Sequence, residues 1–576
     1  MNNSGTGFVT YRILIDGNEV PGTIPVKSIM ISKEVNRIPF AKLAIIDGDP
    51  ASQDFEHSSG GLFVPGNKIE IKAGYHSDEE TIFKGILVRH HVKIRSNNSY
   101  LLLEAKDEAV KMTLRRKSRF FYEMSDAEIM EELISAYDLD MSVEATEVNH
   151  LERVQYRVSD WDYLMLRAQA NGFICLVDDG KITLSKPDFD EEPVETVSFG
   201  ATMLEFDGEI DARNQVSNVV ARSWSHVEQN LLEADVDTLA FETNGNLSSS
   251  ELAAIFGDDS LEVAHGGAKG DAELQNWAEA KMAMHQMAKS RGRVRLQGIP
   301  SVKPGVQLLL EGVGDRFNGK AFISGVTHQI VEGNWTADAQ FGLSPEWFAE
   351  TNASSVNDLP ASGLNTGVHG LQIGVVSQLE GDPDGEERVL VKLPIIDNQE
   401  QGIWCRQAMA DAGNGRGLCF RPELEDEVVI GFINGDPDDA IILGMLHSNG
   451  RPSPIEASDE NHLKGIVTRE GLQFYLDDEK KCMVLKTPDG NKIEISDEEG
   501  AIFLEDSNGN KLVLDNAGIS LESNGDINIK AGGDVNIEGM NVSAYANAKF
   551  VADGGGGAEL TSSAIAVVKG SLVQIN

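Results

Sequence analysis

A short repeat at the end of the chain constrains the fold more than any other feature. Between residues 518 and 576, pairs of apolar residues two positions apart recur every eight residues: Ile519 and Leu521, Ile527 and Ile529, Val535 and Ile537. After a one-residue slip the spacing continues with Val542 and Ala544, Phe550 and Ala552, Ala558 and Leu560, Ala566 and Val568. Residues two apart share one face of a strand, and Gly, Asn and Asp supply the turns. Repeats this short predict a stacked β-structure in which no unit buries its apolar face alone.

The repeat therefore predicts an assembly of several chains. Each octad offers only two inward side chains, so one chain winding alone would have a thin core and unpaired edges. Three chains wound together close the structure, and each face becomes a ladder of strands from alternate chains. The six residues from Ile519 to Ile537 named above are the expected core of this prism. An ordinary meander of short antiparallel strands is the alternative.

Composition narrows the classes of function. The 576 residues carry a net charge of −43, from 49 Lys and Arg against 92 Asp and Glu. This balance argues against binding to polyanions, because phosphate contacts need clustered basic side chains. It favours a particle that stays soluble and does not adhere to itself.

Neither membrane spans nor secretion signals are predicted. No segment approaches 18 consecutive apolar residues, and the start, MNNSGTGFVT, lacks a basic region followed by an apolar run. The chain is therefore expected to be made in the cytoplasm without a signal peptide. The four cysteines have no metal-type spacing and are expected to be reduced: Cys175, Cys405, Cys419 and Cys482.

Residues 1–349 read as strands interrupted by a few helices. The first 120 residues alternate apolar and polar residues between Gly and Asp turns, which predicts a barrel or sandwich. Ser125 and Glu128 form a capping box, and a second helix begins at Ser159 and stops at Gly172. A hairpin with Asp179 at its tip follows. Residues 190–349 repeat the pattern, with a helix predicted near 271–290.

The rest of the chain divides by composition. Residues 350–367 have no apolar period and contain Pro, Gly and Ser, which predicts a linker. Residues 368–447 form a compact module of five or six strands. A neck follows over 448–464, and strands resume from Val467 to the end of the chain.

The module 368–447 carries a resemblance to a known family. GVVSQLEGDPDGEERVLVKLP, followed by WCRQAMADAGNGRGLCFRPELEDEVVIGFINGDPDDAIILGML, resembles the OB-type domain of VgrG proteins and related phage tail spikes. The most specific part runs from Glu427 to Leu446 and contains Gly435-Asp436-Pro437-Asp438; it follows Arg421-Pro422. The segment QYRVSDWDYLMLRAQANGFICLVDDGKITL is similar to the hub of the same family.

The resemblance implies a mainly β protein. Its expected parts are a hub of two barrel-like domains with a few helices (1–349), a linker (350–367), an OB-fold domain (368–447), a neck (448–464) and an intertwined trimeric β-helix needle (465–576). It also implies a homotrimeric, non-enzymatic spike of a contractile injection machine, of the type VI secretion or phage-tail-like kind.

The implied partners and location follow from that family. They are a hexameric tube protein, baseplate proteins, a PAAR-like tip protein and effector cargo, with transient contact to the target membrane. The assembled particle would be delivered outside the cell. The expected docking site for the tip protein is the last six residues: Ser571, Leu572, Val573, Gln574, Ile575 and Asn576.

Several motifs resemble catalytic or metal sites without meeting their requirements. GDRFNGK at 314–320 matches a phosphate-binding loop up to its lysine, but Ala321 replaces the Ser or Thr that would hold Mg²⁺. His90 and His91 are neighbours on a strand and point to opposite faces. DPDG at 382–385 and DSNGN at 506–510 lack the ligand order of a calcium loop and are expected to be turns. No cofactor or metal is expected.

Nucleic-acid binding by the OB-type module is disfavoured. Residues 366–450 contain fifteen acidic and five basic side chains, and Trp404 and Phe420 are expected in its core. The remaining alternatives are a spike with an envelope-degrading or toxin domain, and a receptor-binding tailspike that cleaves sugars. The neck of seventeen residues leaves no room for an inserted enzyme, and aromatic residues after Tyr475 are few.

Overall fold

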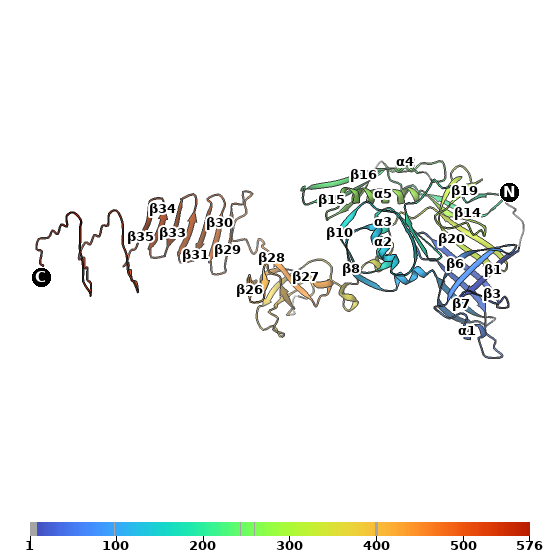
Figure 1. The fold of residues 1–576 in the computed structure, drawn as a ribbon, viewed down its shortest axis with the longest axis horizontal. Helices are drawn as coiled ribbons and strands as arrows, with labels where there is room; N and C mark the ends of the chain where they lie inside the picture. Colours follow the sequence, from blue (N-terminus) through green and yellow to red (C-terminus); the bar gives the residue numbers. More distant parts are fainter. Residues whose placement is uncertain (1–7, 97, 242, 258–259, 398–400, 576) are drawn as a thin grey trace. The chain divides into compact units, whose positions relative to one another are not determined.

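The structure is a computed structural model that describes residues 8–96, 98–241, 243–257, 260–397 and 401–575. Its chain separates into two compact units. The first comprises Met1–Leu371 and Gly431–Ile441, and the second comprises Gln372–Ile430 and Ile442–Asn576. Strands dominate both units (Figure 1). Within the described residues, no helix has the length and apolar character needed to cross a membrane.

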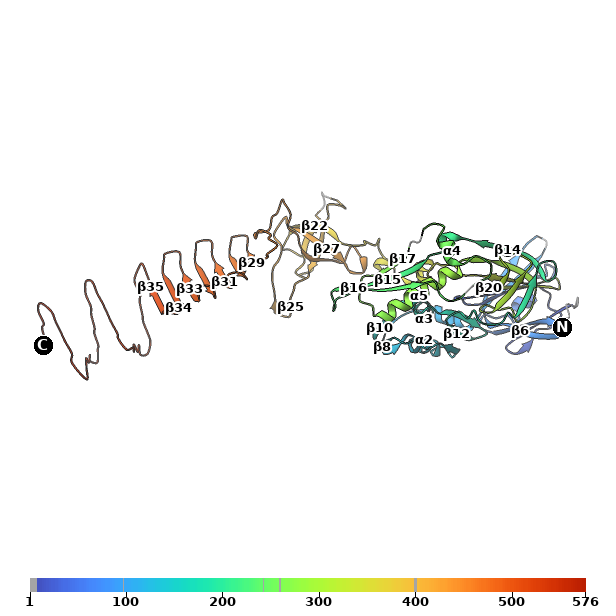
Figure 2. The same ribbon diagram turned by 90° about the horizontal axis from the view of Figure 1, so that it is seen from above.

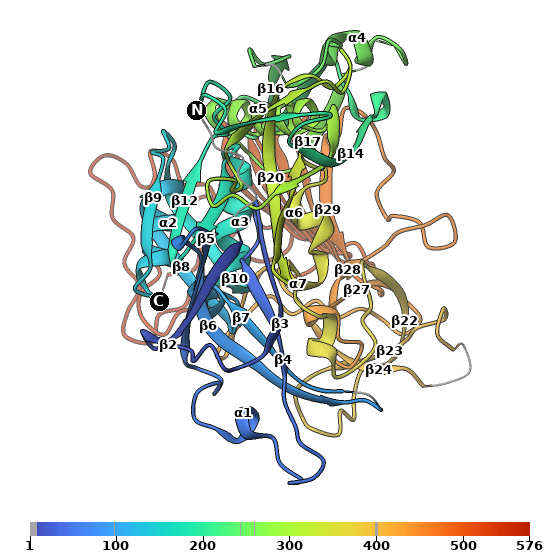
Figure 3. The same cartoon turned by 90° about the vertical axis from the view of Figure 1, so that its right-hand side faces the viewer.

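One sheet of thirteen strands organises the first unit (Figure 3). Its main path runs β14-β18-β21-β20-β3-β4-β7-β6-β5-β1-β2; off this path β19 pairs with β20, and β13 pairs with β19. The bounds are β1 (Val9–Ile15), β2 (Asn18–Glu19), β3 (Val26–Glu34), β4 (Phe40–Ile46), β5 (Lys68–Tyr75), β6 (Asp78–Ile94), β7 (Ser99–Lys106), β13 (Glu195–Ser198), β14 (Met203–Ile210), β18 (Ser290–Gln297), β19 (Gln307–Glu311), β20 (Gly319–Val331) and β21 (Asn334–Phe341). The short α1 (Glu56–Ser59) lies between β4 and β5.

The two halves of the hub share this sheet. β20 pairs antiparallel with β3, with Gln329 opposite Met30, so strands about 300 residues apart are neighbours. The expectation of two barrel-like regions in sequence therefore needs refinement: both regions exist as β-structure, but one hydrogen-bonded ladder runs through both. Their apolar faces form two separate cores, one centred on Ile31 and Leu43 and the other on Val294 and Leu308.

A helical insert lies between β7 and β13. It contains η1 (Glu108–Thr113), β8 (Arg116–Ser125), α2 (Asp126–Ser135), β9 (Asp140–Val143), β10 (Asn149–Ser159), α3 (Asp160–Ala170), β11 (Ile174–Asp178) and β12 (Lys181–Ser185). The Ser125 hydroxyl accepts from the Glu128 amide, and the Glu128 carboxylate accepts from the Ser125 amide, which confirms the predicted capping box. Ser159 caps α3 as predicted. Asp179 and Gly180, both with positive φ, form the tip of the β11–β12 hairpin.

A smaller sheet covers α5 (Asp271–Met287), the helix predicted near 271–290. It consists of β15 (Asn218–Ser225), β16 (Asn230–Asp237) and β17 (Leu261–His265), and the short η2 (Ala212–Asn214) and α4 (Ser249–Ala253) flank it. Leu274, Ala278 and Met282 of α5 pack on the apolar face of β15 and β16 (Figure 1).

The predicted linker is not a featureless chain. It contains the end of α6 (Phe348–Thr351), which begins two residues before it, and all of α7 (Ala353–Val356) and η3 (Pro360–Gly363). Phe348 is buried in the core of the helical insert together with Trp161 and Leu164. The sequence did not predict these helical turns, because each is only four residues long and too short to show an apolar period.

A closed five-stranded barrel, β22-β23-β24-β28-β27, lies mostly in the second unit. The last two residues of β27 and the first two of β28 are assigned to the first unit. The barrel strands are β22 (Gln372–Gln378), β23 (Val389–Lys392), β24 (Ile403–Gln407), β27 (Glu427–Phe432) and β28 (Ala440–Met445), with η4 (Ile433–Gly435) and a small hairpin of β25 (Ala412–Gly413) and β26 (Arg416–Gly417). A closed barrel at this position confirms the expected OB-type module.

Seven more strands follow as an antiparallel sheet in sequence order (Figure 2). They are β29 (Leu463–Val467), β30 (Gln473–Asp477), β31 (Cys482–Lys486), β32 (Lys492–Ser496), β33 (Ala501–Glu505), β34 (Lys511–Asp515) and β35 (Gly518–Glu522). Here the strands of one chain pair with one another. No strand is assigned among residues 523–575.

Candidate functional site: the exposed apolar face of the C-terminal sheet

The sequence of each C-terminal strand fixes which side chains share a face. All seven strands are five residues long, with apolar residues at the second and fourth positions in most of them. In a strand these two positions point to the same side. Short turns rich in Asp, Asn and Gly connect the strands and hold every strand in register with the next.

The register aligns the apolar side chains into two ladders. Paired residues of the first ladder are Leu476, Met483, Ile495, Ile502, Leu514 and Ile519. Paired residues of the second are Phe474, Leu485, Ile493, Leu504, Leu512 and Leu521. Because both ladders use the second and fourth strand positions, they lie side by side on one face of the sheet. We call this surface the apolar face.

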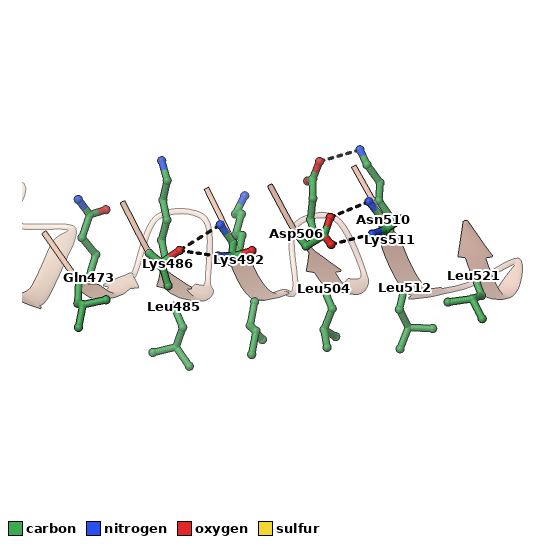
Figure 4. Close-up of a pocket in the computed structure, with 15 residues that line it drawn as sticks. Gln473, Leu485, Lys486, Lys492, Leu504, Asp506, Asn510, Lys511, Leu512 and Leu521 are labelled. Atoms are coloured by element: carbon green, nitrogen blue, oxygen red, sulfur yellow. Dashed lines mark hydrogen bonds and ion pairs between the residues drawn. The ribbon is translucent and has the colours of Figure 1, made fainter. Parts of the chain in front are cut away.

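The apolar face is open to solvent in the single chain. Leu485 is 49% exposed and Ile502 is 36% exposed, although both have paired neighbours on either side. A groove of about 570 Å³ runs along the second ladder. In Figure 4 the apolar and charged side chains project to opposite sides of the sheet: Leu485, Leu504, Leu512 and Leu521 against Lys486, Lys492 and Lys511. A contiguous apolar surface of this kind marks an interface.

Hydrogen bonds of amide and carboxylate groups stabilise the turn 506–510 and connect it to the turn that follows β35. Asp506 accepts hydrogen bonds from the backbone amides of Asn508 and Asn510, at 2.9 Å each, and from the Asn510 side chain at 2.7 Å. The Asn510 side chain lowers the pKa of Asp506. Ser523 donates to Asn510 at 2.6 Å, so the next turn is tied to the previous one. The motif DSNGN is thus a turn, as predicted.

Only two of the six predicted core residues lie in the sheet. Ile519 is paired with Leu514 and Leu521 with Leu512, so both extend the ladders. Ile527, Ile529, Val535 and Ile537 lie in the stretch without assigned strands. All six are exposed in the single chain, Ile519 and Ile537 to 75%. Among the predicted tip residues, Ser571, Leu572, Val573, Gln574 and Ile575 are also exposed, and Asn576 lies outside the described residues.

The motifs set aside as turns or structural residues lie in ordinary structural positions. Residues 312–318 connect β19 to β20, as expected for a turn. The His90 ring contacts the Phe63 carbonyl at 2.8 Å and the Ser58 hydroxyl at 2.7 Å, and His91 follows it on β6. Asp382 accepts hydrogen bonds from the backbone amide and guanidinium of Arg388, which lower its pKa. Within the described residues no group of three or more His, Cys, Asp or Glu is arranged to hold a metal.

The barrel differs from expectation at one aromatic residue. Trp404 is partly buried, but Phe420 is 47% exposed, so it does not belong to the core of a single chain. Phe420 follows the β25–β26 hairpin, outside the five barrel strands, and its carbonyl accepts a hydrogen bond from Gln407 at 2.8 Å. All four cysteines are unpaired in the structure.

Three family models match consecutive parts of this chain. The Alg8 N-terminal domain matches residues 5–332, more than half of the chain. The Type VI secretion system/phage-baseplate injector OB domain matches residues 372–447. The Phage baseplate V C-terminal trimerisation domain matches residues 482–548, which include β31 to β35 and their apolar face.

Individual relatives are similar over limited lengths. The type VI secretion system spike protein VgrG1a of Pseudomonas aeruginosa is 27% identical over 213 residues, which are 35% of this chain and 32% of the relative. The actin cross-linking toxin VgrG1 of Vibrio cholerae is 28% identical over 145 residues, which are 24% of this chain and 12% of the relative. The matches thus span about a third or less of these relatives. A 43 kDa tail protein of prophage MuSo2 from Shewanella oneidensis aligns with a TM-score of 0.46 and 9% identity, covering 58% of this chain and 98% of that protein.

Proposed function

This chain belongs to the family described by the Alg8 N-terminal domain, and it also carries the baseplate OB and trimerisation domains of VgrG-type spike proteins. From this premise we propose that the chain is the central spike of a contractile injection machine. In this role three copies assemble around a common axis. The spike carries a tip and transmits the push of the contracting machine to the target envelope. The particle is delivered outside the cell that makes it.

The exposed apolar face carries the proposal. Two ladders of apolar side chains, with exposed fractions that reach 49% at Leu485 and 75% at Ile519, would not persist on a solitary chain. Burial of such side chains contributes about 1 kcal/mol or more for each one fully removed from water. Two further copies of the same face supply a matching apolar surface, and the trimerisation-domain match covers β31 to β35 of the strands concerned.

The partners follow from the same proposal. The hub would contact a hexameric tube protein and baseplate proteins. The end of the chain, with Leu572, Val573 and Ile575 exposed, would receive a PAAR-like tip protein. The proposed partners also include effector cargo and, transiently, the target membrane.

A spike that also carries an enzyme is the second candidate. It is suggested by the relative whose name describes an actin cross-linking toxin. The matched stretch covers 12% of that relative, and a structural spike requires no catalytic group on this chain. We therefore favour the non-enzymatic role.

The oligomeric state of the purified full-length chain tests the proposal. Sedimentation equilibrium should give three times the chain mass of 62.5 kDa. A monomer at micromolar concentration would refute the spike role. Incubation of the trimer with peptidoglycan or actin should leave both unchanged, whereas degradation or cross-linking would support the enzymatic candidate.

A further inference from the structure

The segment that leads from the hub to the barrel is anchored at its hub end. The amide of Phe348 donates to the Gln169 side chain at 2.7 Å, and the Phe348 ring is buried. The Arg116 guanidinium then donates to the backbone carbonyls of Ser354 and Asn357, at 2.9 and 2.8 Å. These contacts hold α6 and α7 against β8 and α3.

A salt bridge continues this anchor by one residue. Arg157 pairs with Asp358 at 3.0 Å, and its own carbonyl accepts from Arg116 at 3.0 Å. A guanidinium that binds several backbone carbonyls fixes the course of the chain and not merely the position of one side chain. The segment is therefore tied to the hub as far as Asp358.

The following residues are held by the turn between β27 and β28. We call residues 433–438 the clamp turn. Its Gly435 carbonyl accepts from the Val368 amide at 2.8 Å. The Asn434 side chain donates to the Ser362 hydroxyl at 3.3 Å, and the Asn365 side chain donates to the Asp438 carboxylate at 3.2 Å. Residues 360–368 thus contact the clamp turn through both backbone and side chains.

Backbone conformation supports a packed element. Ala361, Ser362 and Gly363 are consecutive residues with φ of 51°, 53° and 75°. Residues other than glycine adopt this region only when the surroundings over-determine it. Ala361 is only 3% exposed, so packing supplies that constraint. A free chain of this Ser-, Asn- and Gly-rich composition would instead be flexible.

Gly435 is the glycine of the clamp turn, and a side chain at this position would be crowded as well as strained. Its φ is +68°, and a Cβ there would lie 3.2 Å from the Val368 carbonyl oxygen and 3.4 Å from the Pro360 Cβ. Gly431–Ile441 is assigned to the first unit, although β27 and β28 belong to the barrel. The chain therefore passes between the two units at three points: 371–372, 430–431 and 441–442.

We propose that the clamp turn and residues 360–368 form a clamp that keeps the segment 348–368 folded. The residues that carry it are Asn365, Val368, Asn434 and Gly435, with Arg116 and Arg157 as the anchor at the hub end. The mechanical purpose of the clamp rests on the proposed spike function, since a spike under load needs folded segments in place of flexible ones. The folded state of the clamp does not depend on that function and is measured separately.

Hydrogen–deuterium exchange on the full-length protein tests the clamp. The Val368 amide should be protected in the wild type, and Gly435→Val should raise its exchange rate at least tenfold. Gly415→Val is the matched control, because Gly415 has the same φ of +68° but no atom within 4 Å of its would-be Cβ. The control should leave the exchange of Val368 unchanged.

A second variant keeps the test decisive if Gly435→Val misfolds. Asn365→Ala combined with Asn434→Ala removes side-chain contacts while leaving every backbone group in place. It should increase proteolytic cleavage between residues 359 and 371 several-fold without changing the cleavage of the hub. Val368 exchange at the rate of an unstructured peptide in the wild type would overturn the proposal. Equal exchange and equal cleavage in the double variant and the wild type would overturn it as well.

Discussion

Arg167 donates hydrogen bonds to both carboxylate oxygens of Asp126, from Nε to Oδ1 at 2.6 Å and from Nη2 to Oδ2 at 2.7 Å. This ion pair connects α3 to the first turn of α2. The Asp126 side chain is 4% exposed and also accepts from Asn171 at 2.8 Å. Burial alone would raise the pKa of Asp126, but the hydrogen bonds and charge of Arg167 outweigh it and lower the pKa to about 2. The pair thus stabilises the helical insert at neutral pH.

Asp126→Asn should destabilise the hub by about 3 kcal/mol, because it leaves the Arg167 guanidinium buried without a counter-charge. Urea unfolding followed by circular dichroism measures the change. Asp211→Asn is the control, since Asp211 pairs with the exposed Arg213 in a surface ion pair and its loss should have little effect. Equal effects of the two substitutions would contradict the stabilising role of the buried pair.

The hub should lose stability in acid through His328. Burial and, to a lesser extent, the charges of Lys33 and Lys303 lower the pKa of His328 to about 3. A hydrogen bond to the Val302 carbonyl raises this pKa but does not offset the other effects. In the unfolded chain this histidine titrates near 6.5. The free energy of unfolding should therefore be at its full value above pH 6.5 and fall by on the order of 4 kcal/mol as the pH drops towards 3.

His328→Gln should flatten that pH dependence. Glutamine does not titrate, and its amide retains a donor for the Val302 carbonyl. The free energy of unfolding of variant and wild type, compared between pH 7 and pH 4, gives the histidine contribution as a difference. Parallel curves for the two proteins would exclude His328 as the source.

Trimerisation should depend on the C-terminal repeat. Deletion of residues 518–576 should weaken the trimer, and Ile527→Asp or Ile537→Asp should disrupt the prism, because threefold symmetry would bring three buried carboxylates together. Sedimentation velocity measures the fraction of trimer. Asn528→Asp adds the same charge on the neighbouring side chain, which points to the opposite side of a strand, and should leave the trimer intact. Full trimer in the Ile527→Asp and Ile537→Asp variants would show that these residues are not its core.

The last six residues should form the docking surface for a tip protein. Removal of 571–576 should abolish co-purification of a co-expressed PAAR-like protein, because it removes the exposed Leu572, Val573 and Ile575. The truncated protein should remain trimeric in sedimentation, which separates loss of docking from loss of folding. Undiminished binding would place the docking site elsewhere.

The barrel should not bind nucleic acid at physiological salt concentration. Its threefold excess of acidic over basic side chains repels phosphates and offers few counterions to release. Fluorescence anisotropy with labelled single-stranded DNA should give no saturable binding near 150 mM salt. Tight binding with a steep dependence on salt concentration would show that Phe420 and nearby groups form a nucleic-acid surface.

Local signals in the sequence determined the elements whose neighbours lie close in the chain. The capping box at Ser125, the Asp179-Gly180 hairpin and the five-residue strands from Cys482 to Glu522 were all predictable. Each depends on residues within about ten positions of one another, so short-range periodicity and turn chemistry suffice to specify it. The exposed ladders at the second and fourth strand positions follow from the same periodicity.

Tertiary structure alone decided the long-range pairings. The β20–β3 ladder that turns two halves into one sheet, the buried Arg167–Asp126 pair, the clamp between Gly435 and Val368, and the exposure of Phe420 have no short-range signal. A backbone edge carries no residue code for its distant partner, and a short polar segment such as 360–368 becomes ordered only when another part of the chain satisfies its hydrogen bonds. Sequence periodicity therefore specified the strands, and packing between distant segments specified how they join.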